Sequence, residues 1–188
     1  ARRPTVVTSN RKLEEISPRL RSRMVEPELS VVYHILAPDF RSSGLDEIGL
    51  DLSNLSYHSD EVFETFDVRT NEIPDERLNN LSKVFQICRA YAEKPEGWLV
   101  LSGSYGVGKT HLAAAIANYR RLEGQSVFFV VVPDLLDHLR AAFSPHSTVS
   151  YDKRFEEVRT APLLVLDDLG TESATPWAKE KLFQLLNH

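Results

Sequence analysis

The sequence predicts an α/β fold: a five-stranded parallel sheet with helices on both faces. First, short runs of apolar, β-branched residues alternate with helical patterns, as in folds whose parallel strands are joined by helices. Second, residues 127–132 and 163–166 are apolar at nearly every position, which indicates strands covered on both faces. Third, a glycine-rich loop lies between one such run and the next helical pattern, where α/β folds bind ligands.

The predicted elements follow one another along the chain. The strands are Thr5–Thr8, Val31–Leu36, Trp98–Ser102, Val127–Val132 and Leu163–Leu166. The helices are Glu76–Glu93, His111–Glu123, Asp134–Phe143, Tyr151–Thr160 and Ala178–Asn187. Gly124 is a natural end for the second helix, and Asp134, directly after Pro133, is expected to cap the third.

Composition limits the class of protein. The chain has 188 residues, of which 42% are hydrophobic and 26% charged, the balance of one compact domain. A net charge of −5 argues against a surface coated in basic residues, although it leaves room for a local basic groove. Cys88 is the single cysteine, so an internal disulfide and a cysteine-rich zinc site are excluded. No apolar run approaches the ~20 residues that span a membrane, and a cytoplasmic location is expected.

Residues 103–110 (GSYGVGKT) match the phosphate-binding pattern G-x-x-x-x-G-K-[ST] at every fixed position. Glycines let successive backbone N–H groups point at phosphates, and the start of the following helix adds unpaired donors and a favourable dipole. Lys109 is expected to act on the β- and γ-phosphates and Thr110 to ligate magnesium. The predicted nucleotide-binding residues are Gly103, Ser104, Tyr105, Gly106, Val107, Gly108, Lys109, Thr110 and His111.

Residues 163–168 (LLVLDD) supply the acidic partner of this loop. An apolar strand that ends in a carboxylate places it at the carboxyl edge of a parallel sheet, where ligands bind. Asp167 is therefore the predicted second magnesium residue, and Asp168 the catalytic residue that orients or polarises the attacking water. The alternative for either aspartate is to cap the following turn.

Asp167 and Gly170 also fit the D-x-x-G pattern of GTP-binding switch proteins. Those proteins read guanine with an N-K-x-D segment, which is absent from this sequence. The predicted cofactors are therefore ATP and Mg²⁺.

Residues 97–118 and 163–172, which carry these motifs, resemble the AAA+ ATPase domain of bacterial DnaC/DnaI-type helicase loaders. They equally resemble the IstB-type helper ATPases of transposition. Residues 62–69 (VFETFDVR) resemble the short segment that leads into this domain. The resemblance implies a P-loop NTPase (AAA+/ASCE) three-layer sandwich with strand order 5-1-4-3-2.

Residues 1–41 resemble the part of the family that comes last in its chain. PTVVTSN (4–10) is similar to the sensor-1 strand, which implies that Asn10 approaches the γ-phosphate. ISPRLRSRM (16–24) is similar to the arginine-finger box, which implies Arg23 as the finger and Arg19 as second choice. The alternatives are a polar residue ending a strand for Asn10 and a solvated helix face for the arginines.

The resemblance thus implies one AAA+ domain over residues 1–188. Residues 1–41 correspond to the sensor-1 and arginine-finger part, 42–71 to a linker and lead-in, and 72–188 to the Walker A/Walker B core. A circular permutation, a renumbered chain, and a tandem or domain-swapped arrangement would each explain this order. The interpretation predicts that Thr5–Thr8 lies between the strands Trp98–Ser102 and Leu163–Leu166.

The resemblance implies an ATPase that loads a replicative helicase and assembles as a ring or spiral on single-stranded DNA. An IstB-like ATPase that assists a transposase on duplex DNA is the alternative. Hydrolysis is expected to be weak and stimulated by assembly or DNA, because Asp168 stands where AAA+ proteins usually have glutamate. Its carboxylate is retracted by roughly 1.5 Å, which can cost about a hundredfold in rate. A nucleotide-binding adaptor without useful hydrolysis stays open, while a P-loop kinase would need an arginine-rich lid that the sequence lacks.

Overall fold

The computed structural model describes residues 3–36, 53–68, 74–141, 151–171 and 175–187, with the backbone alone at 141 and 151–154. Its strands are β1 (Thr5–Ser9), β2 (Ser30–Ile35), β3 (Trp98–Gly103), β4 (Val127–Val131) and β5 (Leu163–Asp167). Its α-helices are α1 (Pro18–Met24), α2 (Asp75–Glu93), α3 (Lys109–Leu122), α4 (Val132–Ala141), α5 (Tyr151–Thr160) and α6 (Pro176–Leu186). Short 3₁₀ turns lie at Leu13–Glu15 (η1), Asn54–His58 (η2) and Phe63–Thr65 (η3).

The five described strands form one parallel sheet in the order β2-β3-β1-β5-β4. This order is the predicted 5-1-4-3-2 arrangement, with β2 in the place of the fifth strand and β1 in the place of the fourth. The predicted place of Thr5–Thr8 is confirmed, because Val7 pairs with Val100 of β3 on one side and Leu166 of β5 on the other. The first strand of the chain is therefore the central strand of the sheet.

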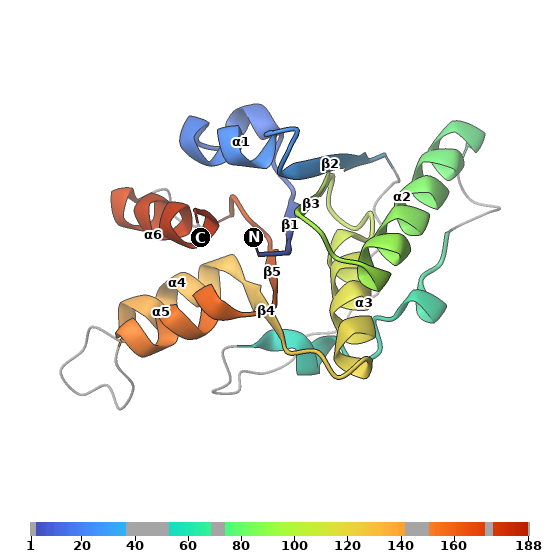
Figure 1. Cartoon of the computed structure of the whole chain (residues 1–188). Helices are drawn as coiled ribbons and strands as arrows, with labels where there is room; N and C mark the ends of the chain where they lie inside the picture. The colour runs from blue at the N-terminus through green and yellow to red at the C-terminus, as the bar shows by residue number, and fades with distance from the viewer. Residues whose placement is uncertain (1–2, 37–52, 69–73, 142–150, 172–174, 188) are drawn as a thin grey trace.

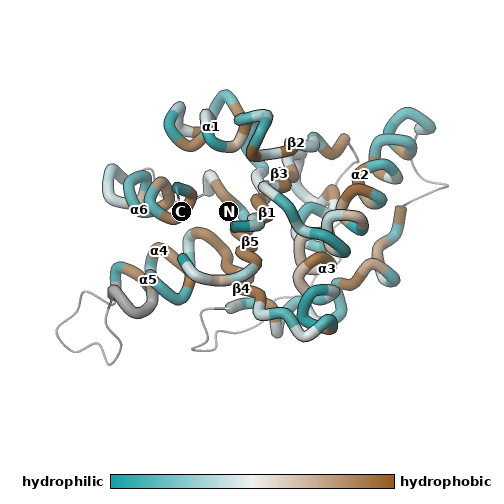
Figure 2. The backbone as a smooth tube through the Cα atoms, viewed as in Figure 1, coloured by the Kyte–Doolittle hydropathy of each residue, from teal (hydrophilic) through white to brown (hydrophobic). Residues whose placement is uncertain are grey.

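Helices cover both faces of the sheet, as the continuous apolar strands predict (Figure 1). Side chains alternate across β1, so Val6 packs with α2 and α3 whereas Val7 packs with α1, α4, α5 and α6. Both valines are fully buried. In Figure 2 hydrophobic residues concentrate along the strands and hydrophilic ones on the outer turns of the helices. The result is the predicted three-layer sandwich.

Four helices, α2, α3, α4 and α6, begin one or two residues earlier than the sequence pattern predicts. Helix α4 begins at Val132, so Pro133 lies in its first turn, where a missing N–H breaks no helical hydrogen bond. Asp134 is therefore inside the helix, and its predicted capping role is wrong. Helix α6 begins at Pro176 and is capped by Thr175, whose Oγ1 accepts the Ala178 N–H at 3.2 Å. Within the described residues, no helix is both long and apolar enough to cross a membrane.

Arg3 joins the beginning of the described chain to its end. Its guanidinium donates to the carbonyls of Val158 (2.6 Å) and Arg159 (2.5 Å) near the end of α5, and to that of Leu185 (3.0 Å) in α6. Burial, followed by the positive charge of Arg159, lowers the pKa of Arg3 to about 10, so the group stays charged at neutral pH. A cation at two helix C-termini also meets the negative ends of both helix dipoles.

Replacing Arg3 with alanine is expected to lower the free energy of unfolding by about 2 kcal/mol, because hydrogen bonds from a charged donor are lost. Urea denaturation followed by circular dichroism measures the change. Arg77→Ala, which removes an exposed arginine, is the control and should stay within about 0.5 kcal/mol of wild type. Equal stability of the two variants would contradict a clamping role for Arg3.

Candidate functional site

The glycine-rich loop connects the carboxyl end of β3 to the first residue of α3, as predicted. Gly103 and Gly108 have φ angles of +154° and +93°, which favour glycine. Space also requires glycine at both positions, since a Cβ would lie 2.5 Å from the Ile35 carbonyl oxygen at Gly103 and 2.7 Å from the Phe66 ring at Gly108. The loop is therefore held against β2 on one side and residue 66 on the other.

The remaining loop residues differ in exposure. Val107 is fully buried in the core beneath the loop, whereas Tyr105 is 53% exposed. Ser104 supplies the carbonyl oxygen that accepts the Lys109 ammonium at 2.7 Å. Lys109 is only 5% exposed, so its amine is kept inside the curve of the loop, where a phosphate-binding lysine belongs.

Thr110 and Asp167, the predicted magnesium residues, lie together although 57 residues separate them. The Thr110 hydroxyl donates to the Asp167 carboxylate, with its Oγ1 3.1 Å from Oδ1 and 3.0 Å from Oδ2. Burial raises the pKa of Asp167, and the hydrogen bond from Thr8 is the largest of the effects that lower it. The Asp167 carboxylate is buried beside the Thr110 hydroxyl and next to the phosphate loop. Mg²⁺ prefers oxygen ligands of this kind, so the residues present fit Mg²⁺ bound together with ATP.

The two predicted catalytic residues of the carboxyl edge are also in contact. Asn10, which follows β1, donates from Nδ2 to Oδ1 of Asp168 at 2.5 Å. Asp168 has a φ of +58°, a left-handed conformation that aspartate adopts more readily than most residues. Thr171 closes the turn by donating from its backbone and its hydroxyl to the Asp168 carbonyl, at 3.3 and 2.8 Å. The turn after β5 thus presents the Asp168 side chain toward the end of β1.

Thr8 is a site residue that the sequence analysis missed. It is fully buried at the carboxyl end of β1; its hydroxyl donates to Asp167 Oδ1 and accepts the Asp168 N–H at 2.9 Å. The available signal was its position two residues before Asn10 in a strand predicted to lie beside β5.

His111 is held by residues 62–66. Its Nε2 donates to the Val62 carbonyl at 2.9 Å and lies 3.3 Å from the Thr65 hydroxyl. Its ring meets the Phe66 ring edge-on, with centroids 5.2 Å apart. The imidazole is engaged by these contacts, so a nucleotide contact from His111 would come from its backbone in the first turn of α3.

Arg23 lies far from these groups within the chain. With Thr5, Leu29 and Trp98 it lines a cavity of about 90 Å³ at the amino ends of β1 and β3, whereas the phosphate loop follows the carboxyl end of β3. Its Nη1 is 3.4 Å from Glu26 Oε2. The structure therefore does not bring Arg23 to the phosphate loop of its own chain.

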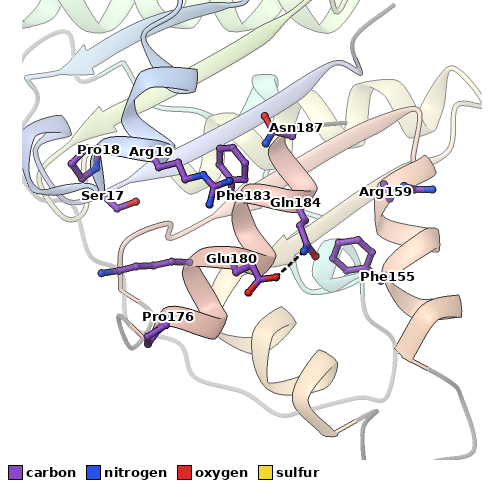
Figure 3. Close-up of a pocket in the computed structure, with 11 residues that line it drawn as sticks. Ser17, Pro18, Arg19, Phe155, Arg159, Pro176, Glu180, Phe183, Gln184 and Asn187 are labelled. Atoms are coloured by element: carbon purple, nitrogen blue, oxygen red, sulfur yellow. Dashed lines mark hydrogen bonds between the residues drawn. The ribbon is translucent and has the colours of Figure 1, made fainter.

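Arg19, the second finger candidate, lies one helical turn away in α1. Its guanidinium carbon is 3.4 Å from the centre of the Phe183 ring, in a groove of about 1000 Å³ between α1, α5 and α6 (Figure 3). This stacking fixes Arg19 against α6.

Known proteins are similar to this chain in sequence. Residues 39–188 match the family described as IstB-like ATP binding protein. The replicative helicase loader DnaI of Bacillus subtilis is 34% identical over 107 residues, covering 56% of this chain and 33% of that protein. Replicative helicase loaders DnaC of Escherichia coli K12 and Buchnera aphidicola (Acyrthosiphon pisum) are 32% and 31% identical, covering 59% and 56% of this chain and 44% of each relative. The chain thus spans less than half of these relatives, and no solved structure matches it.

Proposed function

Because the chain belongs to the IstB-like ATP-binding protein family, we propose that it is an ATPase of the helicase-loader type that binds ATP with magnesium at residues 103–110 and Asp167. The observation that carries the proposal is the contact between Thr110 and Asp167 beside the phosphate loop. The reaction is ATP + H₂O → ADP + phosphate. The same proposal treats residues 1–188 as one AAA+ domain.

Each side chain of the site has a distinct task in this proposal. Lys109 exchanges its contact with the Ser104 carbonyl for the β- and γ-phosphate oxygens. Thr110 and Asp167 would hold the magnesium ion, which neutralises phosphate charge. Asp168 orients the attacking water, and Asn10 fixes the Asp168 carboxylate while its amide can reach toward the γ-phosphate.

Slow hydrolysis follows from the same contacts. The aspartate side chain reaches less far than a glutamate, and Asp168 spends one oxygen on the Asn10 amide at 2.5 Å. A water-orienting group must approach to about 3 Å of the water, so both features reduce the fraction of productive encounters. We expect the rate to rise when assembly or DNA changes this arrangement.

The proposed task is delivery of a replicative DNA helicase to single-stranded DNA. Three relatives at 31–34% identity are named replicative helicase loaders, which supports this partner. Self-association into a ring or spiral would bring Arg23 of one subunit to the phosphate loop of the next, since the two groups lie at opposite ends of the sheet. That task implies a cytoplasmic location.

Assistance to a transposase on duplex DNA is the second candidate, because the residues that carry the motifs also resemble the IstB-type helper ATPases and the matching family is described as IstB-like. The two candidates differ in the DNA on which they assemble. Fluorescence anisotropy with a labelled single strand and with the matching duplex separates them, because a loader should prefer the single strand.

The specific ATPase activity is expected to increase with protein concentration, because the arginine finger comes from a second subunit. Arg23→Ala should remove this increase and lower the maximal rate roughly tenfold, a modest effect because the basal reaction is slow. Phosphate release is measured over a range of protein concentrations, without DNA and with each DNA form. Arg21→Ala, on the same helix, is the matched control. A specific activity that is independent of concentration would count against the finger.

A further inference from the structure

Thr8 makes two hydrogen bonds that together specify the direction of its hydroxyl. A threonine hydroxyl has one proton and two lone pairs. The proton goes to the Asp167 carboxylate, and a lone pair accepts the backbone N–H of Asp168 at 2.9 Å. One side chain of β1 therefore contacts both consecutive acidic residues at the end of β5.

The bond to Asp167 constrains the carboxylate itself. Oδ1 accepts from Thr8 and, at 3.1 Å, from Thr110, whereas Oδ2 accepts from Thr110 at 3.0 Å. Thr110 is a proposed metal ligand, so a bound ion would share its hydroxyl with the Asp167 carboxylate. The hydrogen bond from Thr8 comes from β1, so it does not depend on Thr110. In a buried site such a bond to a charged group is strong and fixes one orientation of the carboxylate.

The bond from Asp168 constrains the turn that follows β5. Asp168 has a φ of +58°, in the left-handed region. A residue other than glycine keeps this unfavourable conformation only where neighbouring groups hold its backbone. The Asp168 N–H donates to the Thr8 hydroxyl, and the N–H of the next residue, Leu169, donates to the Thr8 carbonyl at 3.0 Å. The Ser9 hydroxyl donates to the Leu169 carbonyl at 2.8 Å. The end of β1 thus fastens the turn at three points, of which Thr8 supplies two.

We propose that Thr8 is a positioning residue of the nucleotide site, which directs the Asp167 carboxylate toward the metal ion and fixes the backbone of Asp168. The inference rests on the proposed function, because it assigns Thr8 a role toward the magnesium that ATP brings. Thr8 acts through Asp167 and touches neither the metal nor the nucleotide. Asn10 has a different partner, because its amide donates to the Asp168 side chain.

The test compares Thr8→Val, which has nearly the same shape without a hydroxyl, with Thr8→Ser, which retains it. Affinity for a fluorescent ATP analogue is measured with Mg²⁺ and with EDTA. Thr8→Val is expected to reduce the gain in affinity that Mg²⁺ provides about tenfold, as loss of a group behind a metal ligand does, and to leave the affinity in EDTA unchanged. Thr8→Ser should keep the gain.

Thr5→Val is the matched control, since Thr5 is a buried threonine at the opposite end of the same strand, with its hydroxyl on the Arg3 carbonyl. It should match wild type with and without Mg²⁺. Thermal unfolding verifies that each variant is folded. If valine at position 8 prevents folding, Thr8→Ala replaces it, because the smaller side chain fits the space, and the same selective loss is required.

Two results would overturn the role of Thr8 while leaving the ATP site intact: a wild-type Mg²⁺ gain in Thr8→Val, or an equal loss of affinity with and without Mg²⁺. The second result would mean that Thr8 supports the fold of the loop in general. A wild-type protein with no Mg²⁺ gain at all would instead refute the proposed function.

Discussion

Lys109→Ala is expected to weaken ATP binding and hydrolysis by roughly 10²–10³-fold. Lys109 is 5% exposed and its ammonium is held 2.7 Å from the Ser104 carbonyl, so the charge is already inside the loop that would receive the phosphates. Without it, the charge of the triphosphate meets backbone N–H groups and the helix N-terminus alone. Isothermal titration calorimetry with ATP and Mg²⁺ measures the affinity directly.

The control for this variant is Lys94→Ala, because Lys94 is an exposed lysine paired with Glu96 on the surface. It should bind ATP like wild type. Alanine is the best helix former, so α3 should still begin at position 109, and a loss of binding cannot be attributed to the helix. Unchanged ATP affinity in Lys109→Ala would mean that the triphosphate binds elsewhere.

Asp167→Asn is expected to have opposite effects on activity and stability. Hydrolysis should fall roughly 10²–10³-fold, because an amide replaces the charged ligand of the magnesium ion. The nucleotide-free protein should become more stable at neutral pH, since Asp167 is 4% exposed and the ionised form of its carboxyl group is disfavoured by burial. Urea denaturation of both proteins without nucleotide measures the stability difference.

The pH dependence of this difference has a defined sign. Burial raises the pKa of Asp167 in the folded protein above its value in the unfolded chain. The folded state therefore holds the proton more tightly, and the stability from this group is fully present below the unfolded pKa. It is lost as pH rises through the folded pKa. The advantage of Asp167→Asn should accordingly be smallest in acid and grow toward neutral pH.

Asp60→Asn, which changes an exposed aspartate, is the control for the pH series and should follow wild type. A less stable Asp167→Asn at neutral pH would contradict the expectation. It would mean that the hydroxyl bonds from Thr8 and Thr110 outweigh the cost of burying the charge.

The sheet and the phosphate loop could be predicted because their signals are local. Strand and helix patterns identify themselves within a few residues, and the loop from Gly103 to Thr110 has fixed spacing. The central place of β1 followed from the resemblance of PTVVTSN to a sensor-1 strand, since no local pattern states which strands are neighbours. Helix starts were less accurate, because Pro133 and Pro176 look like breaks but are tolerated in a first turn.

The contacts that the sequence analysis missed depend on residues far apart in the chain. Thr8 and Asp167 are separated by 159 residues, and Arg3 and Leu185 by 182. The bond from His111 to the Val62 carbonyl depends on a side-chain direction that periodicity does not give. The proposed role of Arg23 depends on a second subunit, because Arg23 lies at the amino ends of β1 and β3, away from the loop of its own chain.

The central position of β1 has a consequence for how the molecule acquires its fold. Its hydrogen-bonding neighbours are β3 and β5, which follow about 90 and 160 residues later in the chain. During synthesis β1 leaves the ribosome before either neighbour, so one of its edges stays unpaired until β3 has been made and the other until β5 has been made. Pairing over such sequence separations is slow, and unpaired apolar strands associate with other chains. We therefore expect β1 to be the strand that most readily pairs with other chains before the sheet has formed.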